Sequence, residues 1–308
     1  PENPNRENPN RENPNRENPT LQPMYTQSIT RSHRTAFFLA IDCSGSMAEP
    51  IHFRGGCKAK SEVVATIANE LLFELIERAR RSDGVRDYYD IAVLGYHGDD
   101  EVTPLLADRA AMHTVCELAA MEPRIRTELL EYRLPDGGIS LREIPTPCWV
   151  EPRAEGQTPM CEALRRIRDL AAEWVLRPEN AESFPPVVFN ITDGEATDCD
   201  GEELRTVAEQ IRSLATADGN VLLVNIHIAT AADMRPLLFP EPSEEHYANR
   251  YASLLYDCSS TMPEPFHAAI RELKGAGALP PFRGLCFNAS AAELVSALNI
   301  GSISVKTE

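Results

Sequence analysis

The 308-residue sequence lacks long apolar runs and is short of basic residues. Its longest apolar stretches, residues 36–41 and 221–228, are strand-length, whereas a membrane-spanning helix needs about 20 residues. We therefore do not expect the chain to be an integral membrane protein. Lys and Arg number 30 against 47 Asp and Glu, which gives a net charge of −17. Such a charge repels phosphate backbones, so we expect no nucleic-acid partner, but it attracts cations.

Common cysteine and catalytic motifs are also missing. The eight cysteines are scattered without a Cys-x-x-Cys pair, which argues against a structural zinc site and against a compact disulfide framework. We interpret them as reduced and mostly buried, which predicts a cytoplasmic location. The sequence has no G-x-G-x-x-G after its first strand, no phosphate-binding loop with its Lys, no G-x-S-x-G around Ser44 and no paired-histidine metal motif.

The first twenty residues are a pentapeptide array that reads PENPN, RENPN, RENPN and RENPT. Repeated proline prevents helix and strand pairing, and the array has nothing apolar to bury. We therefore predict a disordered tail over residues 1–29. Its four Glu and three Arg nearly cancel, so it is no basic arm. The array could be inert, or it could tether a partner.

From about residue 30 the sequence alternates between strand and helix patterns. Continuous apolar runs predict strands, and apolar residues three and four apart predict amphipathic helices. Strands separated by helices imply parallel pairing and a sheet covered on both faces. The predicted fold class is thus a doubly wound, mostly parallel, Rossmann-like α/β domain over residues 30–308. The expected strands are 36–41, 89–96, 186–192, 221–228 and 284–288, and the expected helices are 61–81, 160–174, 203–215 and 291–298.

Two stretches are longer than simple crossovers. Residues 124–151 hold two strand-like runs around Pro135-Asp136-Gly137-Gly138, which predicts an inserted β-hairpin. Residues 231–265 are rich in Pro, Glu and Tyr and carry no clear period. We expect both at the edge or rim of the sheet, where binding specificity is often found.

Three short polar motifs follow predicted strands or open a helix. They are Asp42-Cys43-Ser44-Gly45-Ser46, Gly156-Gln157-Thr158-Pro159 and Thr192-Asp193-Gly194. Ligands of open parallel sheets bind outside the carboxyl ends of the strands, so the three motifs can converge. Their oxygen donors suit Mg²⁺ or Mn²⁺, and an open coordination position would attract an acidic group. The candidate metal ligands are Asp42, Ser44, Ser46, Thr158 and Asp193.

This pattern resembles the metal-ion-dependent adhesion site of von Willebrand factor A domains, and the resemblance covers roughly residues 34–300. It implies a Rossmann-like sheet with one antiparallel edge strand. It also implies direct metal ligation by Ser44, Ser46 and Thr158, with Asp42 and Asp193 acting mostly through water. Residues 184–198 and 214–225 are similar to bacterial intracellular members, which are often encoded beside a metal-dependent phosphatase and a protein kinase. The repeat tail and the hairpin fall outside the family pattern.

Taken singly, the motifs have simpler interpretations. Ser-Gly-Ser and Asp-Gly are common in turns, and Thr158 before Pro159 could serve as a helix N-cap. Cys43 is either a buried side chain or a redox-sensing thiol. The acidic residues after Asp193 either stabilise a helix N-terminus or hold a second cation. These acidic residues are Asp198, Asp200, Glu202 and Glu203.

The favoured hypothesis is a non-enzymatic interaction module that binds an Asp or Glu of a protein partner through its divalent cation. The 126–144 hairpin and residues 231–265 would supply selectivity. An alternative is a Mg²⁺-dependent aspartyl-phosphate phosphotransferase or phosphatase with Asp42 as nucleophile. Ser44 stands where such enzymes commonly carry a second carboxylate. A third hypothesis is a regulatory subunit whose tail recruits the partner while the metal only stabilises the fold.

Overall fold

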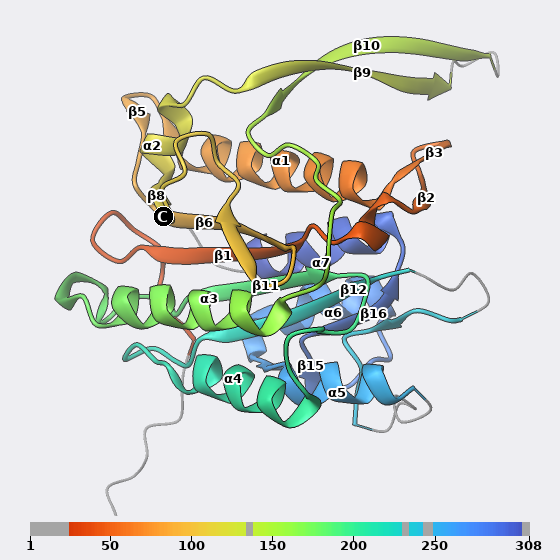
Figure 1. The fold of residues 1–308 in the computed structure, drawn as a ribbon. Coiled ribbons are helices and arrows are strands. Elements are labelled where there is room, and N and C mark those ends of the chain that lie inside the picture. The colour runs from red at the N-terminus through yellow and green to blue at the C-terminus, as the bar shows by residue number, and fades with distance from the viewer. Residues whose placement is uncertain (1–24, 134–137, 230–233, 243–248, 304–308) are drawn as a thin grey trace, which may run out of the picture.

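The computed structural model describes residues 25–133, 138–229, 234–242 and 249–303, which are built around an eight-stranded sheet (Figure 1). Its strands lie in the order β13, β16, β12, β11, β1, β6, β7, and β8 also pairs with β6. Their bounds are β1 Thr35–Asp42, β6 Tyr89–His97, β7 Glu101–Pro104, β8 His113–Thr114, β11 Val187–Thr192, β12 Leu222–Ile228, β13 Leu237–Leu238 and β16 Leu285–Ala289.

The central strands are parallel, and the strands at both edges are antiparallel. β1 pairs in parallel with both β6 and β11, whereas β7 runs against β6 and β13 runs against β16. The predicted doubly wound, mostly parallel sheet is therefore confirmed, with two antiparallel edges where the resemblance implied one. The strand order reverses between β1 and β11, so these neighbours flank the point where open sheets of this kind bind ligands.

Helices cover both faces of the sheet, as predicted. Alternate residues of β1 explain this, because Phe37 and Leu39 pack with α1 and α7, while Phe38 packs with α3 and α4 on the other face. The helices are α1 Lys60–Ala79, α2 Val115–Ala120, α3 Met160–Val175, α4 Gly201–Ser213, α5 Arg250–Cys258, α6 His267–Lys274 and α7 Ala291–Ile303, with short 3-10 turns at Gly45–Ala48, Pro178–Asn180 and Glu264–Phe266.

Four two-stranded antiparallel sheets lie outside the main sheet in the described residues, and one of them, β2–β3, comes between β1 and α1 in the chain. It therefore brings the chain back beside the end of β1, on the right of Figure 1. The pairs are β2 Pro50–Phe53 with β3 Gly56–Ala59, β4 Arg80–Arg81 with β5 Gly84–Val85, β9 Arg124–Arg133 with β10 Ile139–Cys148, and β14 Thr261–Met262 with β15 Phe282–Arg283.

The predicted hairpin within residues 124–151 is present as β9 and β10, although part of its turn, 134–137, lies outside the described residues. Its expected place at the sheet edge or rim was wrong, because it lies outside α1 and forms a sheet of its own (Figure 1). Asn69 of α1 anchors the returning strand. Its Oδ1 accepts the N–H groups of Trp149 and Val150, and its Nδ2 donates to the Val150 carbonyl.

The 231–265 segment is more regular than its sequence pattern suggested. Its first strand, β13, does pair at the sheet edge, but the segment also contains α5, whose buried Tyr251 and Leu255 pack against β16. Residues 230–233 and 243–248 lie outside the described part of the chain. The sequence prediction assigned no residues to the antiparallel strand β7 or to the helices α2, α5 and α6.

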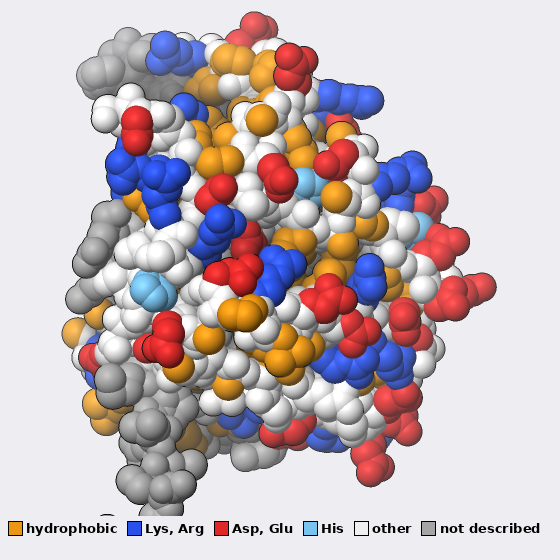
Figure 2. Space-filling view, turned by 90° about the vertical axis from the view of Figure 1, so that its left-hand side faces the viewer, with side chains coloured by type: hydrophobic (Ala, Val, Ile, Leu, Met, Phe, Trp, Pro, Cys, Tyr) orange, Lys and Arg blue, Asp and Glu red, His pale blue; other side chains and the backbone are white. Residues whose placement is uncertain are grey.

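The start of the described chain packs onto the domain. Tyr25 lies against Phe184 with ring centroids 6.0 Å apart, and Ile29 is fully buried, although both fall within the predicted tail. The pentapeptide array lies outside the described residues. In the described part of the chain, every helix is too short or too polar to cross a membrane. Figure 2 shows acidic and basic side chains intermixed over one face of the molecule.

Candidate metal centre

The first and third motifs lie side by side because β1 and β11 are neighbouring parallel strands. Ile41 pairs with Ile191, so Asp42 and Thr192 end the two strands together. Asp42 is fully buried, and both of its carboxylate oxygens are occupied. Oδ1 accepts the Ser44 N–H at 2.8 Å, and Oδ2 accepts the Thr192 hydroxyl at 2.8 Å. Asp42 therefore fastens the Ser44 loop to the end of β11.

The serine hydroxyls and Asp193 form a connected cluster of oxygens. Ser44 Oγ lies 3.2 Å from Ser46 Oγ, and the Ser46 hydroxyl donates to Asp193 Oδ1 at 2.6 Å. Adjacent ligands of an octahedral Mg²⁺ at about 2.1 Å stand roughly 3 Å apart. The spacing of this oxygen cluster therefore fits a small hard cation.

The second motif is brought to the same edge through its backbone. The Gly45 N–H donates to the Gly156 carbonyl at 3.0 Å, and the Gln157 N–H donates to the Gly98 carbonyl at 2.9 Å. Gly156 adopts a positive φ of 73°, and a Cβ there would stand only 2.6 Å from the Gly98 backbone. Only glycine permits this close approach to Gly98, and the Gly45–Gly156 hydrogen bond holds the motif that carries Thr158 next to the serine loop.

Thr158 does not act as the N-cap of α3, which was its simpler interpretation. The N–H groups of Cys161 and Glu162 donate instead to the carboxylate of Asp198, at 3.1 and 2.8 Å. Thr158 uses its backbone, whose N–H donates to Thr197 Oγ1 at 3.0 Å. The Thr158 hydroxyl is thus not committed to capping the helix.

The acidic residues after Asp193 act at helix N-termini, as their simpler interpretation predicted. Asp198 caps α3, and Asp200 caps α4 by accepting the N–H groups of Glu202 and Glu203. In the described part of the chain, no group of three or more His, Cys, Asp and Glu side chains is placed to hold a metal. A cation at the predicted site would therefore depend on the hydroxyls.

Lys60 is a member of this cluster that the sequence prediction missed. It begins α1, its side chain is only 2% exposed, and its Nζ lies 2.9 Å from Asp193 Oδ2 and 2.8 Å from Glu49 Oε2. Burial acts to lower the pKa of Lys60, but the hydrogen bonds and charges of the two carboxylates outweigh it and raise the pKa. No local pattern identifies Lys60, since its contact with Asp193 joins positions 133 residues apart.

Burial shifts the pKa of two groups beneath the motifs. It raises the pKa of Asp42, against the hydrogen bonds from Ser44 and Thr192. It also raises the pKa of the Cys43 thiol to about 12. A thiol that stays protonated is a poor nucleophile, so the geometry favours the buried-side-chain interpretation of Cys43 over a redox sensor.

Aromatic side chains pack around the loop that carries Asp193. The His227 ring stacks on Phe287 at 4.2 Å and meets the Tyr251 ring edge-on at 5.7 Å. Burial lowers the pKa of His227 to about 4, so the imidazole is neutral at pH 7. The Tyr251 hydroxyl donates to the Gly194 carbonyl. Helix α5 is thereby connected to the residue that follows Asp193.

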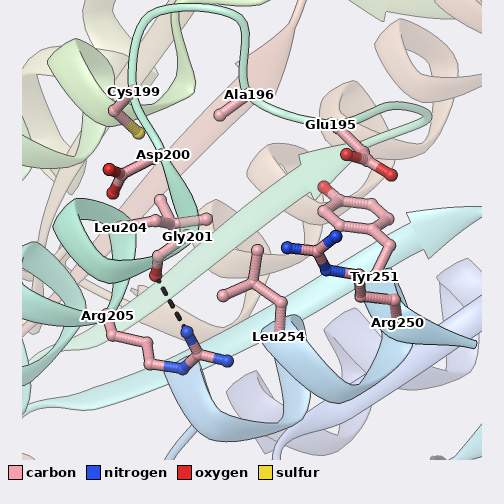
Figure 3. A pocket seen from close by; sticks show the side chains of 10 residues that line it. All are labelled: Glu195, Ala196, Cys199, Asp200, Gly201, Leu204, Arg205, Arg250, Tyr251 and Leu254. Atoms are coloured by element: carbon pink, nitrogen blue, oxygen red, sulfur yellow. Dashed lines mark hydrogen bonds between the residues drawn. The ribbon is translucent and has the colours of Figure 1, made fainter.

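A pocket of about 420 Å³ adjoins this loop at Glu195 and lies between the starts of α4 and α5. Figure 3 shows Glu195, Arg250 and Tyr251 on one side of it and Arg205 on another. Leu204 and Leu254 give it an apolar wall. The pocket can therefore take a side chain that has both apolar and charged parts.

Comparisons with known proteins concern the fold alone. No protein-family model matches the sequence, and no curated protein matches it. Solved structures similar to the chain include von Willebrand factor type A from Catenulispora acidiphila, with 14% identity and a TM-score of 0.33 over 64% of this chain and 34% of that chain. The von Willebrand factor domain of the type V pili tip protein Mfa5 from Porphyromonas gingivalis gives 13% identity and a TM-score of 0.28 over 53% of this chain and 39% of that chain.

The chain thus spans well under two thirds of the length of both neighbours. An uncharacterized membrane spanning protein from Vibrio fischeri gives 11% identity and a TM-score of 0.25 over 64% of this chain and 71% of that chain. The assignment of the fold rests on the strand order and the two helical layers described above.

Proposed function

We propose that the chain is a non-enzymatic protein-interaction module that uses a divalent cation, Mg²⁺ or Mn²⁺, to bind an Asp or Glu side chain of a partner protein. Ser44, Ser46 and Thr158 would ligate the cation directly, and Asp42 and Asp193 would act mainly through water. When bound, the cation supplies a Lewis-acidic position that accepts a carboxylate oxygen.

The observation that carries this proposal is the convergence of oxygens from separate motifs at the topological switch point. Ser44 and Ser46 hydroxyls lie 3.2 Å apart, and Asp193 contacts Ser46 at 2.6 Å although it lies 147 residues away in the sequence. The Thr158 loop is held beside them through Gly156. Such a set of oxygen donors, with few charges, favours a hard cation that keeps its attraction for a further carboxylate.

Selectivity for a partner would come from the surfaces around this centre. The hairpin of β9 and β10 projects beyond α1, and its Ile125 side chain is 63% exposed. The pocket beside Gly194 offers Arg250 and Glu195 to side chains that flank the partner's acidic residue. These features support recognition of an extended segment around the partner's acidic residue rather than of a single carboxylate.

The geometry favours this module over the aspartyl-phosphate enzyme. A nucleophilic Asp42 needs a carboxylate oxygen that can reach a phosphorus atom. Asp42 is fully buried, and the Ser44 N–H and the Thr192 hydroxyl occupy its two oxygens. Turnover of p-nitrophenyl phosphate that is lost in Asp42→Asn would instead support the enzyme.

We also propose a bacterial, cytoplasmic setting in which a kinase and a phosphatase are encoded nearby. Support for this setting comes from the resemblance of residues 184–198 and 214–225 to intracellular members of the family. Free cysteines such as the buried Cys43 and Cys161 agree with a reducing compartment. Capture of a kinase or a phosphatase in the experiment below would support this setting.

The test is a Ser46→Ala variant, because Ser46 is exposed and its loss costs the fold little. Asp193→Ala is less suitable, since it would leave the buried Lys60 without its 2.9 Å partner. We expect Mn²⁺ affinity, measured by isothermal titration calorimetry, to fall at least about tenfold in Ser46→Ala. Ser32→Ala, in the loop before β1 at the other end of the strand, is the matched control and should bind like wild type.

The same proteins then serve as baits in a pull-down from source lysate with Mg²⁺ or EDTA, read by mass spectrometry. Proteins retained by wild type only with Mg²⁺, and lost by Ser46→Ala, would support the proposal. An identical set in Mg²⁺ and EDTA would contradict it. If deletion of residues 1–20 removed that metal-independent set, the regulatory subunit with a recruiting tail would replace the interaction module.

A further inference from the structure

Lys60 places a permanent positive charge inside the candidate metal centre. Its ammonium group lies 2.9 Å from Asp193 Oδ2, while the other oxygen of the same carboxylate accepts the Ser46 hydroxyl at 2.6 Å. The Asp193 carboxylate therefore bridges the lysine and the predicted ligand cluster. Lysine is rarely buried without a partner, so its burial here reflects this pairing.

The backbone fixes where Lys60 stands. The Lys60 N–H donates to the Glu49 carbonyl at 2.9 Å, so the chain that leaves the serine loop returns to the same point through β2 and β3. Glu49 supplies the second carboxylate, 2.8 Å from Nζ, from an exposed position. The lysine is thus held by the main chain and by carboxylates on two sides.

We propose that Lys60 is a positioning residue of the metal site that weakens cation binding and holds Asp193 in place when no cation is bound. This inference rests on the proposed function. Lys60 offsets one negative charge of the carboxylates in this cluster, which include Asp193 and Glu49. Because Lys60 repels both charges of a divalent cation inside a region of reduced dielectric, its removal should strengthen cation binding.

Two neutral variants separate the charge of Lys60 from its hydrogen bond. Lys60→Met removes both, whereas Lys60→Gln keeps an N–H donor for Asp193. Lys58→Met is the control, because it removes an equal charge only two residues from Lys60. The Lys58 side chain is exposed and lies over the Phe53 ring, outside the candidate metal centre. Mn²⁺ affinity is measured by isothermal titration calorimetry, and Tm is measured in EDTA and in saturating Mn²⁺.

We expect Lys60→Met and Lys60→Gln to bind Mn²⁺ at least about tenfold more tightly than wild type, and Lys58→Met to stay within about twofold. In EDTA, the Tm of Lys60→Met should fall most, because Asp193 keeps a buried charge without its cation partner. Saturating Mn²⁺ should raise the Tm of Lys60→Met more than that of wild type.

The outcomes distinguish this inference from the proposed function. Tighter Mn²⁺ binding by the Lys60 variants than by wild type supports the inference. If the variants bind Mn²⁺ and wild type does not, the inference stands and the proposed function is contradicted. If wild type binds Mn²⁺ and the folded Lys60 variants bind it equally or more weakly, the inference is overturned and the proposed function is upheld. If no protein binds Mn²⁺, both are overturned. If Lys60→Met does not fold, the Mn²⁺ affinity is measured on Lys60→Gln, which is purified in Mn²⁺.

Discussion

Asn69→Ala should detach the β9–β10 hairpin from the domain at a measurable cost in stability. Asn69 is only 4% exposed in the middle of α1, and it makes three hydrogen bonds of 2.8–2.9 Å with the backbone of Trp149 and Val150. Each buried polar group that loses its partner costs about 1–3 kcal/mol. The Val150 N–H and carbonyl are buried, whereas water can reach the half-buried Trp149.

The expected net loss for Asn69→Ala is about 2–3 kcal/mol of unfolding free energy. This value takes the Val150 N–H at about 2–3 kcal/mol and the Val150 carbonyl, which keeps the Cys148 thiol as a donor at 3.3 Å, at about 1 kcal/mol. It then subtracts roughly 0.6 kcal/mol, because alanine is a better helix former than asparagine. Urea unfolding followed by circular dichroism measures the loss. Tryptic cleavage at Arg124 and Arg126, next to the released segment, should also become faster.

Glu70→Ala is the control for Asn69→Ala. It changes the neighbouring helix residue, whose surface ion pair with Arg54 is 2.7 Å long and worth at most about 1 kcal/mol. The reasoning is refuted if Asn69→Ala loses no more unfolding free energy than Glu70→Ala and its hairpin resists trypsin as the wild-type hairpin does. Water would then replace the asparagine at little cost.

Three further predictions follow from single contacts. Gly156→Ala should lose about 1–3 kcal/mol in urea unfolding and weaken Mn²⁺ binding, because its Cβ would meet the Gly98 backbone at 2.6 Å. Asp198→Ala should lose about 1–2 kcal/mol, since it uncaps α3, and unfolding at fixed pH measures this. Lowering the pH from 7 to 5.5 should reduce the unfolding free energy of wild type by about 1 kcal/mol through His227. The unfolded imidazole takes up a proton over this range, whereas the folded imidazole, with a pKa of about 4, does not. As the pH is lowered, the unfolding free energy of His227→Phe should therefore fall less steeply than that of wild type. Equal slopes would contradict a lowered pKa for His227.

The sequence was a good guide to the central architecture and a poorer guide to the periphery. Buried parallel strands such as β1 and β11 are continuous apolar runs, so their pattern is visible without any partner. The edge strands β7 and β13 are short and only half-buried, so they carry no such pattern. Helix α5 was missed because it is only nine residues long and follows a polar, proline-containing stretch.

By itself, the sequence determined the central parallel strands and the polar residues that end them. The carboxyl ends of parallel strands meet at one edge, so Asp42 and Asp193 had to lie near each other once β1 and β11 were neighbours. Only the tertiary structure decided that Lys60 pairs with Asp193 and that Asn69 holds the hairpin outside α1. Strand and helix periods depend on nearby residues, whereas these contacts depend on the packing of segments far apart in the chain.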